Sequence, residues 1–347
     1  EGMKSGAEAW LYDEDRWPSG FAGGLCTSGG DHLRSKSIGV FKGFVDGFEI
    51  KEFTPLYFKE SDNGFIIVDR KDASAAKKDV YTAGACYGKK TPRLNNESYL
   101  DVLSKEAVRA FIDSTYEPYK KRLKKYFGKS IPGMFTDEPS YRYTTKPDAI
   151  DIARLTGPGV KNFLFHMPWT SGFDAEFKKA YGYGFRERIP EYAFSKSATR
   201  VRYDYWKLVT RLFVTNYTEQ IARWCEKNNL KLTGHYLMEQ TMLSQTQSIG
   251  SAMQHYVHMQ EPGIDILKES REEVLTVKQV SSVAHQMGRE RVLSELYGCS
   301  GWNFTFEGQK AIGEWQYALG INHRCQHLSL YSFRGCRKRD YPPSFHY

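Results

Sequence analysis

Two glutamates of this sequence each follow a short apolar run with the character of a β-strand. Glu138 follows residues 134–137, which end in a second carboxylate, Asp137, and Glu295 follows residues 292–294. A carboxyl group next to another carboxylate at a strand end should have a raised pKa, as a general acid working near neutral pH requires. The alternatives are helix capping by the Asp137-Glu138 pair and a loop salt bridge for Glu295.

A third group of polar residues follows the apolar run 230–232. It contains His235 and, four residues later, Glu239. His235 either contacts a substrate directly or is a structural histidine with its hydrogen bonds satisfied inside the protein. Glu239 could orient the substrate, support a metal, or act in proton transfer as the partner of Glu138, and the sequence leaves these three roles open.

A fourth cluster, Asp13-Glu14-Asp15, follows the first apolar run and lies just before Trp17. Three carboxylates so close together could bind a hard cation such as calcium, which takes oxygen ligands, although surface solvation is the alternative. We select Asp15 as a candidate substrate-binding residue.

Aromatic and basic side chains complete the candidate set. Trp17, Trp169 and Trp302 could each stack on the apolar face of a sugar ring, with core packing as the alternative for Trp17 and Trp169. Trp302 lies shortly after Glu295, so an acid and an aromatic ring would enter one cleft. Arg334 could bind a hydroxyl or carboxylate of a substrate. These residue types together favour a carbohydrate ligand.

The elements that must position these residues alternate between strands and helices. Polar residues at the carboxyl ends of several strands predict a (β/α)₈ barrel, because its active site is built from the loops that follow the strands. A doubly wound sheet would more often have a glycine-rich phosphate loop after its first strand, and the glycines there lack that spacing.

The six candidate strands are 10–12, 134–135, 230–232, 263–267, 292–293 and 328–331. The candidate helices are 105–127, 198–228, 276–287 and 305–319. Since a full barrel needs eight strands, we place the first two upstream of Glu1.

Two regions interrupt this rhythm within a catalytic barrel region that spans residues 1–347. Residues 39–98 contain short β-like pieces separated by turns, which predict a small antiparallel insertion. The pieces are 44–50, 56–58, 65–68 and 80–86. Residues 142–168 are rich in Pro, Gly, Thr and charge, and predict an irregular insertion loop at the barrel mouth.

Composition excludes several classes of protein. With 40% hydrophobic residues in 347 the chain can bury a core, so it is not a disordered protein. The net charge of +8 lies in short runs rather than a basic stripe, which argues against nucleic-acid binding. No apolar run is long enough to span a membrane. The six scattered cysteines favour a cytoplasmic location, while periplasmic or secreted locations stay open because a leader could precede Glu1.

Several of these motifs together resemble the α-L-rhamnosidase family of glycoside hydrolases, glycoside hydrolase family 106. The resemblance covers nearly the whole chain apart from the two insertions. The motifs are residues 11–24, residues 135–139, Thr233-Gly234-His235 with Glu239, Ser294-Glu295 with Gly301-Trp302, and residues 331–343.

The resemblance implies a (β/α)₈ catalytic barrel inside a longer protein that carries β-sandwich domains. It also implies calcium-dependent hydrolysis of terminal α-L-rhamnosides with inversion, without assigning the calcium ligands. By position, Glu138 would be the acid at the end of the fourth strand and Glu295 the base at the end of the seventh. Two alternatives remain: a retaining glycosidase of the same barrel class with another sugar specificity, and a catalytically silent barrel that only binds carbohydrate.

Overall fold

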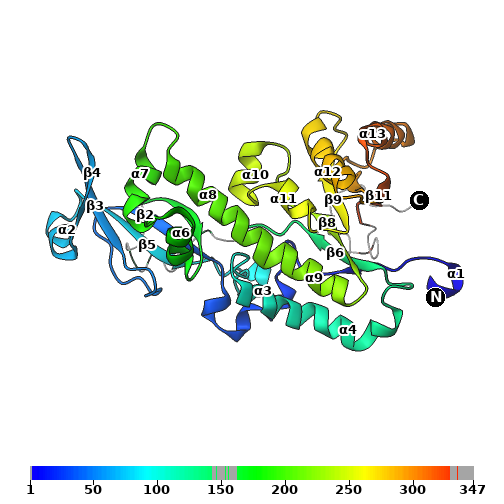
Figure 1. Ribbon diagram of the computed structural model, residues 1–347, viewed down its shortest axis with the longest axis horizontal. Coiled ribbons are helices and arrows are strands. Elements are labelled where there is room, and N and C mark those ends of the chain that lie inside the picture. The colour runs from blue at the N-terminus through cyan, green and yellow to red at the C-terminus, as the bar shows by residue number, and fades with distance from the viewer. Residues whose placement is uncertain are drawn as a thin grey trace. The chain divides into compact units, whose positions relative to one another are not determined.

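A computed structural model of the chain describes residues 2–142, 146, 153, 155, 162–328 and 334 (Figure 1). The chain forms two compact units. The first comprises residues 1–19, 119–139 and 218–347, and the second comprises residues 20–118 and 140–217. The second unit therefore takes in more of the chain than the 39–98 segment in which the sequence indicates β-structure.

The first unit contains a parallel sheet of six strands. In their order across the sheet these are β1 (Leu11–Tyr12), β6 (Gly133–Asp137), β8 (Lys231–His235), β9 (Glu261–Ile266), β10 (Leu293–Leu296) and β11 (His323–Gln326). Within this sheet, each strand pairs with the sheet's next strand in the sequence. The strand order therefore never reverses, whereas it does in a doubly wound sheet. This agrees with the predicted α/β class and strand order of a barrel. The six strands are a partial barrel, and the two upstream strands stay a prediction.

The sixth strand differs from the prediction. The sequence placed it at 328–331, but β11 ends at Gln326 and Leu328 lies outside it. Residues 329–331 lie outside the described residues. The error arose because Leu328 and Leu330 gave a stronger apolar signal than the polar run 323–326. That polar run forms β11 at the edge of the described sheet, where one side of the strand has no neighbouring strand among the described residues.

The spacing between β6 and β8 depends on a glycine. Gly234 has φ +119°, and a Cβ atom added there would lie 1.9 Å from the backbone oxygen of Thr136, its partner in the register. Any other residue would push the two strands apart. Since Asp137 and His235 are the next pair in the same register, this glycine allows them to lie side by side.

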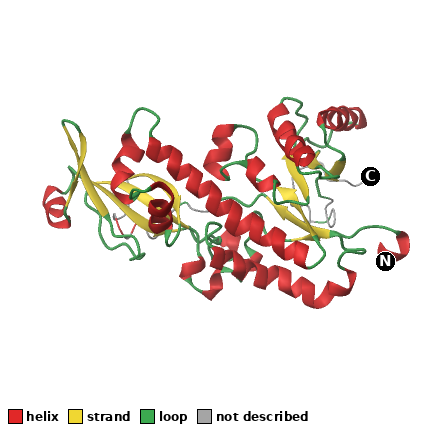
Figure 2. Ribbon diagram, viewed as in Figure 1, coloured by secondary structure: helices red, strands yellow, loops and turns green. Residues whose placement is uncertain are grey.

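Helices alternate with the strands of the first unit, as predicted, and α1 precedes the first strand (Figure 2). They are α1 (Gly2–Ser5), α9 (Gln220–Lys227), α10 (Met242–Ser248), α11 (Ala252–Tyr256), α12 (Val274–Gln286) and α13 (Phe306–Leu319). The predicted helix 305–319 is confirmed, since Thr305 caps α13 by accepting a hydrogen bond from the Gly308 amide, and Gly320 ends it in a left-handed conformation. Ile312 of α13 packs on Leu296 of β10.

The two long predicted helices are also confirmed, each with a wider turn inside it. The 198–228 prediction corresponds to α8 (Arg200–Phe213), a π-helical segment (Val214–Glu219) and α9. The 105–127 prediction corresponds to α3 (Lys105–Phe111), a π-helical segment (Ile112–Tyr116), α4 (Glu117–Leu123) and a 3₁₀ turn (Lys124–Tyr126). The side chains of Thr199 and Ser104 cap α8 and α3.

The second unit is built on an antiparallel sheet of five strands. Its order is β4 (Gly64–Val68), β3 (Leu56–Ser61), β5 (Tyr81–Tyr87), β2 (Lys36–Lys42) and β7 (Phe163–Trp169). The helices of this unit are α2 (Arg70–Ala76), α3, α6 (Phe173–Tyr181), α7 (Ile189–Phe194) and α8. Short 3₁₀ turns lie at Ala22–Gly24, Thr27–Gly29, Asp31–Leu33, Pro92–Leu94 and Arg186–Arg188.

Two β predictions in this unit need correction. Residues 44–50 form no strand, although Val45, Phe48 and Ile50 are buried, so their apolar pattern reflects burial of a loop in the core. Residues 163–168, expected in an irregular loop, lie in β7. The proline content of the region favoured a loop, but Pro168 lies in an edge strand, where proline is tolerated. Most of the remaining 142–168 region lies outside the described residues.

Two global features follow from the described part of the chain. None of its helices combines the length and the apolar character that crossing a membrane would require. Its five cysteines are free thiols, and three of them are buried.

Candidate active site

Glu138 is presented by a backbone turn directly after β6. Its φ of +47° is unusual for a residue with a side chain, and its amide donates a hydrogen bond to the backbone oxygen of His235 at 3.1 Å. The turn leaves Glu138 partly exposed, whereas Asp137 before it is buried. The indole Nε1 of Trp17 donates a hydrogen bond to Glu138 Oε2 at 2.6 Å. Burial and the neighbouring charge of Asp137 raise the pKa of Glu138 to about 7, although His235 acts in the opposite direction.

Asp137 forms a second carboxyl pair with a residue that follows β1. The Tyr12 hydroxyl donates a hydrogen bond to Asp137 Oδ2, and the carboxyl group of Glu14 also hydrogen-bonds Asp137. Burial raises the pKa of Glu14 to about 9, and the charge of Asp137 adds to the effect. Two carboxyl groups this close share a proton or need a cation between them.

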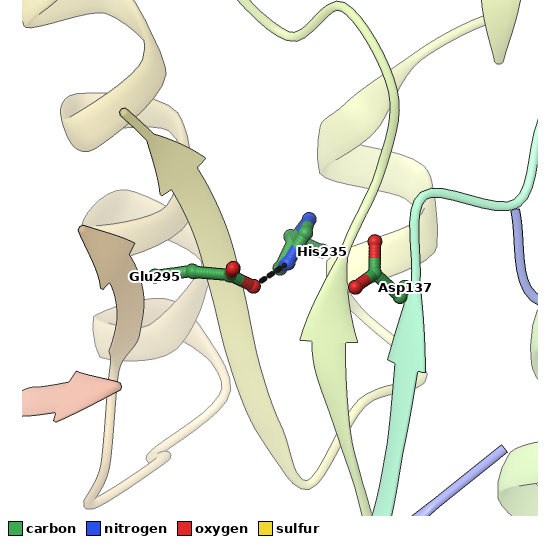
Figure 3. A group of neighbouring side chains, drawn as sticks. All are labelled: Asp137, His235 and Glu295. Carbon is green, nitrogen blue, oxygen red and sulfur yellow. Dashed lines mark hydrogen bonds and ion pairs between the residues drawn. The ribbon is translucent and has the colours of Figure 1, made fainter. Parts of the chain in front are cut away.

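His235 and Glu295 form a buried pair at the ends of β8 and β10. His235 Nε2 lies 2.8 Å from Glu295 Oε2, and Figure 3 shows the imidazole lying between Glu295 and Asp137. Burial alone would lower the pKa of His235, but the hydrogen bond to Glu295 and the charges of Asp137 and Asp265 together raise it well above its usual value. The ring nitrogen therefore donates to the Glu295 carboxylate.

The imidazole of His235 connects two groups of carboxyls. One atom each from Asp137, His235 and Glu295 lie within 4.8 Å of one another, and the same holds for Glu138, His235 and Asp265. Asp265 is on β9, opposite Glu295 in the register. Burial raises its pKa well above the usual value, and the nearby carboxyls act in the same direction. The carboxyl ends of β6, β8, β9 and β10 thus bring four acids and one histidine together.

The structure brings together four candidates named from the sequence, Asp137, Glu138, His235 and Glu295, at the strand ends. Glu239 also lies nearby, but it is buried and protein donors occupy both of its oxygens. The Tyr256 hydroxyl and the Tyr236 amide donate to Oε1, and the Asp265 amide donates to Oε2. Burial raises its pKa to about 7. Glu239 therefore fastens the segment after β8 to β9 by hydrogen bonds.

The aromatic and basic candidates have different surroundings. Trp17 contacts Glu138 directly, and Trp302 is 56% exposed after β10. Arg334 is exposed. Trp169 needs correction: it belongs to the second unit, is 1% exposed, and donates from Nε1 to Asp174 Oδ2 at 3.2 Å. Its ring is core packing and has no free face for a sugar.

The three carboxylates of the acidic run after β1 differ in their surroundings. Asp15 is exposed, Asp13 is buried and accepts a hydrogen bond from Ser19, and Glu14 is the residue that reaches Asp137. Consecutive residues in an extended segment face different sides, so composition alone could not tell which of the three carboxylates enters the site.

Two residues of the cluster were missed by sequence reasoning. Tyr12 was treated only as part of an apolar run. Asp265 could have been found from the sequence, because it is a single acid between Ile264 and Ile266 in a predicted strand. Burying a carboxyl group there is costly unless a partner or a ligand compensates for it.

The carboxyl groups of Glu14 and Asp137 are the donors best suited to calcium. They offer only oxygen atoms, as this hard cation prefers, and a positive charge would stabilise carboxylates whose pKa values are raised mainly by burial. The nitrogen of His235 is a poor calcium ligand, so the groups centred on this imidazole are less suited to it.

Comparison with known proteins finds similarity to carbohydrate-active enzymes. No protein-family model matches the chain. A curated relative named putative beta-glucuronidase, from Formosa agariphila, is 28% identical over 193 residues, covering 52% of this chain and 16% of the relative. Among solved structures, the rhamnosidase from Novosphingobium sp. PP1Y matches with a TM-score of 0.52 and 19% identity, covering 72% of this chain and 23% of that one. The chain thus spans about a sixth and a quarter of these proteins, and the structural likeness shows a shared fold.

Proposed function

We propose that this chain carries the catalytic centre of a glycoside hydrolase, with Glu138 as general acid and Glu295 as general base. The observation that supports this most strongly is the position of His235: it binds Glu295 at 2.8 Å and has a ring nitrogen within 4.8 Å of a Glu138 carboxyl oxygen. Two carboxyl groups in different surroundings, one buried and paired with an imidazole and one partly exposed beside an indole, are suited to different tasks. The similarity to glycosidases points to the same reaction class.

In the proposed reaction Glu138 gives its proton to the glycosidic oxygen as the bond to the anomeric carbon breaks. Glu295 takes a proton from the water that attacks this carbon from the opposite face. Trp17 holds the Glu138 carboxyl group by its indole N–H, and His235 fixes the Glu295 carboxylate. The free sugar and the protonated leaving group are the two products.

We propose inversion rather than retention. A retaining enzyme holds its two carboxyls about 5–5.5 Å apart for direct attack on carbon, and an inverting enzyme leaves about 6.5–9.5 Å for a water. His235 lies 2.8 Å from Glu295 and has a ring nitrogen within 4.8 Å of a Glu138 carboxyl oxygen, and an imidazole held beside both carboxyl groups favours the wider separation.

For the sugar we propose an uncharged glycone, terminal α-L-rhamnose. The charges that act on Asp137, Glu138 and Asp265 come mainly from other carboxyl groups and from His235. A uronate would bring a further negative charge into this cluster, which disfavours it. This supports rhamnoside hydrolysis, as in the name of the structural neighbour, over glucuronide hydrolysis, as in the name of the curated relative.

Calcium is part of the proposal. Glu14 and Asp137 would hold it, and when bound it would coordinate sugar hydroxyls and offset the negative charge of the cluster. We further propose that residues 1–347 are one region of a longer enzyme with flanking β-sandwich domains.

A panel of aryl glycosides tests the function. We expect turnover of the α-L-rhamnoside, little turnover of the β-D-glucuronide, and a first product of inverted anomeric configuration by NMR. Glu138→Gln and Glu295→Gln should each lower kcat by about 10²–10⁴-fold, while Glu272→Gln, at an exposed position, should retain activity. Sugar binding without turnover of any glycoside would instead indicate a silent carbohydrate-binding barrel.

A further inference from the structure

Asp265 occupies an unusual position in β9. Its neighbours Ile264 and Ile266 are buried in the core, while its own side chain is partly exposed on the other face of the strand. Its amide donates to Glu239 Oε2 at 3.3 Å, so the backbone at this point is held by a buried carboxyl group. The register places Asp265 directly opposite Glu295.

Two polar atoms near this point have no hydrogen-bond partner among the described residues. They are the Oδ1 oxygen of Asp265 and the Nδ1 nitrogen of His235, and both atoms are buried. His235 as a whole is only 1% exposed. Leaving a buried polar atom unpaired is costly in free energy, so such atoms in a native fold need a reason.

The position of the unpaired atoms suggests that reason. Asp265 and His235 belong to the group whose atoms lie within 4.8 Å of one another and of the Glu138 carboxyl. Asp265 contributes an unpaired acceptor oxygen and His235 an unpaired ring nitrogen, and two neighbouring residues with such atoms are the complement of a hydroxyl group, which can donate one hydrogen bond and accept others.

We propose that Asp265 determines sugar specificity by binding one ring hydroxyl of the glycone, with His235 Nδ1 as the second contact. The hydroxyl donates its hydrogen bond to Asp265 Oδ1. This inference rests on the proposed function, because it assumes that the sugar cleaved between Glu138 and Glu295 is the one bound here. It adds that one particular hydroxyl of that sugar is recognised directly by protein atoms.

A series of mono-deoxy aryl glycosides of the sugar that is turned over tests the inference. For the wild type, kcat/KM should fall by about tenfold to hundredfold when the recognised hydroxyl is absent, because two buried polar atoms are then left unpaired. Asp265→Ala and Asp265→Leu should each reduce that penalty to less than about threefold. Glu290→Ala, which removes an exposed carboxylate of the same unit, should retain the wild-type penalty.

Thermal unfolding separates this role from a structural one. Because Asp265 Oδ1 makes no described hydrogen bond, we expect Asp265→Ala and Asp265→Leu to keep or raise the Tm. Variants with a lowered Tm and an unchanged deoxy-sugar penalty would show that Asp265 is structural, which would overturn the inference.

The outcome can be told apart from failure of the proposed function. If glycosides are hydrolysed but the Asp265 variants keep the wild-type penalty for every deoxy analogue, the subsite is wrong and the hydrolase proposal stands. If nothing is hydrolysed, calorimetric binding of L-rhamnose and its deoxy forms replaces the rate measurement. Loss of binding selectivity in Asp265→Ala would then support the subsite alone, and no binding of any sugar would overturn both.

Discussion

We expect His255 to make the folding stability of the first unit depend on pH. It lies in α11 and is fully buried. Its Nε2–H donates to the backbone oxygen of Ile249 at 3.0 Å, its Nδ1 lies 2.7 Å from Thr218 Oγ1, and its ring stacks on Tyr236. Burial lowers its pKa from 6.5 to about 3. The hydrogen bond to Ile249 opposes this shift and the nearby His258 adds to it.

The direction of the effect follows from where the proton binds. Below pH 6.5 the unfolded chain takes up a proton at His255, while the folded chain does not until the pH approaches about 3. Stability from this group is therefore fully present above pH 6.5 and falls as the pH drops from 6.5 towards 3. Each pKa unit is worth about 1.4 kcal/mol, so lowering the pH from 8 to 5 should remove about 2 kcal/mol of unfolding free energy through His255.

Urea unfolding at pH 8 and pH 5 measures this contribution. His255→Gln keeps an amide donor for Ile249 but cannot titrate, so its loss of stability between the two pH values should be smaller than that of the wild type by about 2 kcal/mol. His285→Gln, at an exposed position in α12, is the matched control and should retain the wild-type difference. Equal pH dependence in the wild type and His255→Gln would refute the conclusion that His255 is neutral and buried in the fold.

Three further predictions concern the site. Trp17→Phe keeps an aromatic ring but loses the N–H donor to Glu138, so kcat for aryl rhamnosides should fall by about tenfold with a smaller change in KM; an unchanged kcat would show that this hydrogen bond does not position the acid. Glu239→Gln should lower the Tm and raise KM while the shape of the pH–rate profile is kept, and loss of one limb of that profile would make Glu239 an acid or base. Exhaustive chelation should reduce activity and lower the Tm of the wild type, and Glu14→Gln should remove the Tm response to added calcium; full activity after chelation, with no metal found by elemental analysis, would exclude the metal.

The grouping of the main carboxyls was predictable because it follows from one rule of parallel sheets. The carboxyl ends of neighbouring parallel strands meet at one edge, so polar residues that follow separate apolar runs come together. Asp137, His235 and Glu295 are spread over 159 positions from 137 to 295, counting both ends, yet they lie within one cluster. To predict that these three residues come together, it was enough to identify the strands that precede them.

The errors came from properties that depend on distant contacts. Whether Trp169 offers a free face depends on Asp174 and Phe53 packing around it, and nothing in its local sequence shows this. Which carboxylate of the 13–15 run hydrogen-bonds Asp137 was equally hidden, because it depends on how the segment after β1 turns. The same holds for residues 44–50, whose apolar side chains fill a core without joining a sheet.

Gly234 limits how the proposed catalytic centre can be altered. The side chains around it can be exchanged one by one, and such changes could adjust selectivity or proton affinity in small steps. The distance between β6 and β8 cannot be adjusted in this way, because the residue that sets it already has no side chain and the next smallest would collide with the Thr136 oxygen. Gly234→Ala should therefore abolish activity from a position that contributes no group to the reaction. Screens for altered sugar preference would succeed on β9 and β10 and find position 234 intolerant of every substitution.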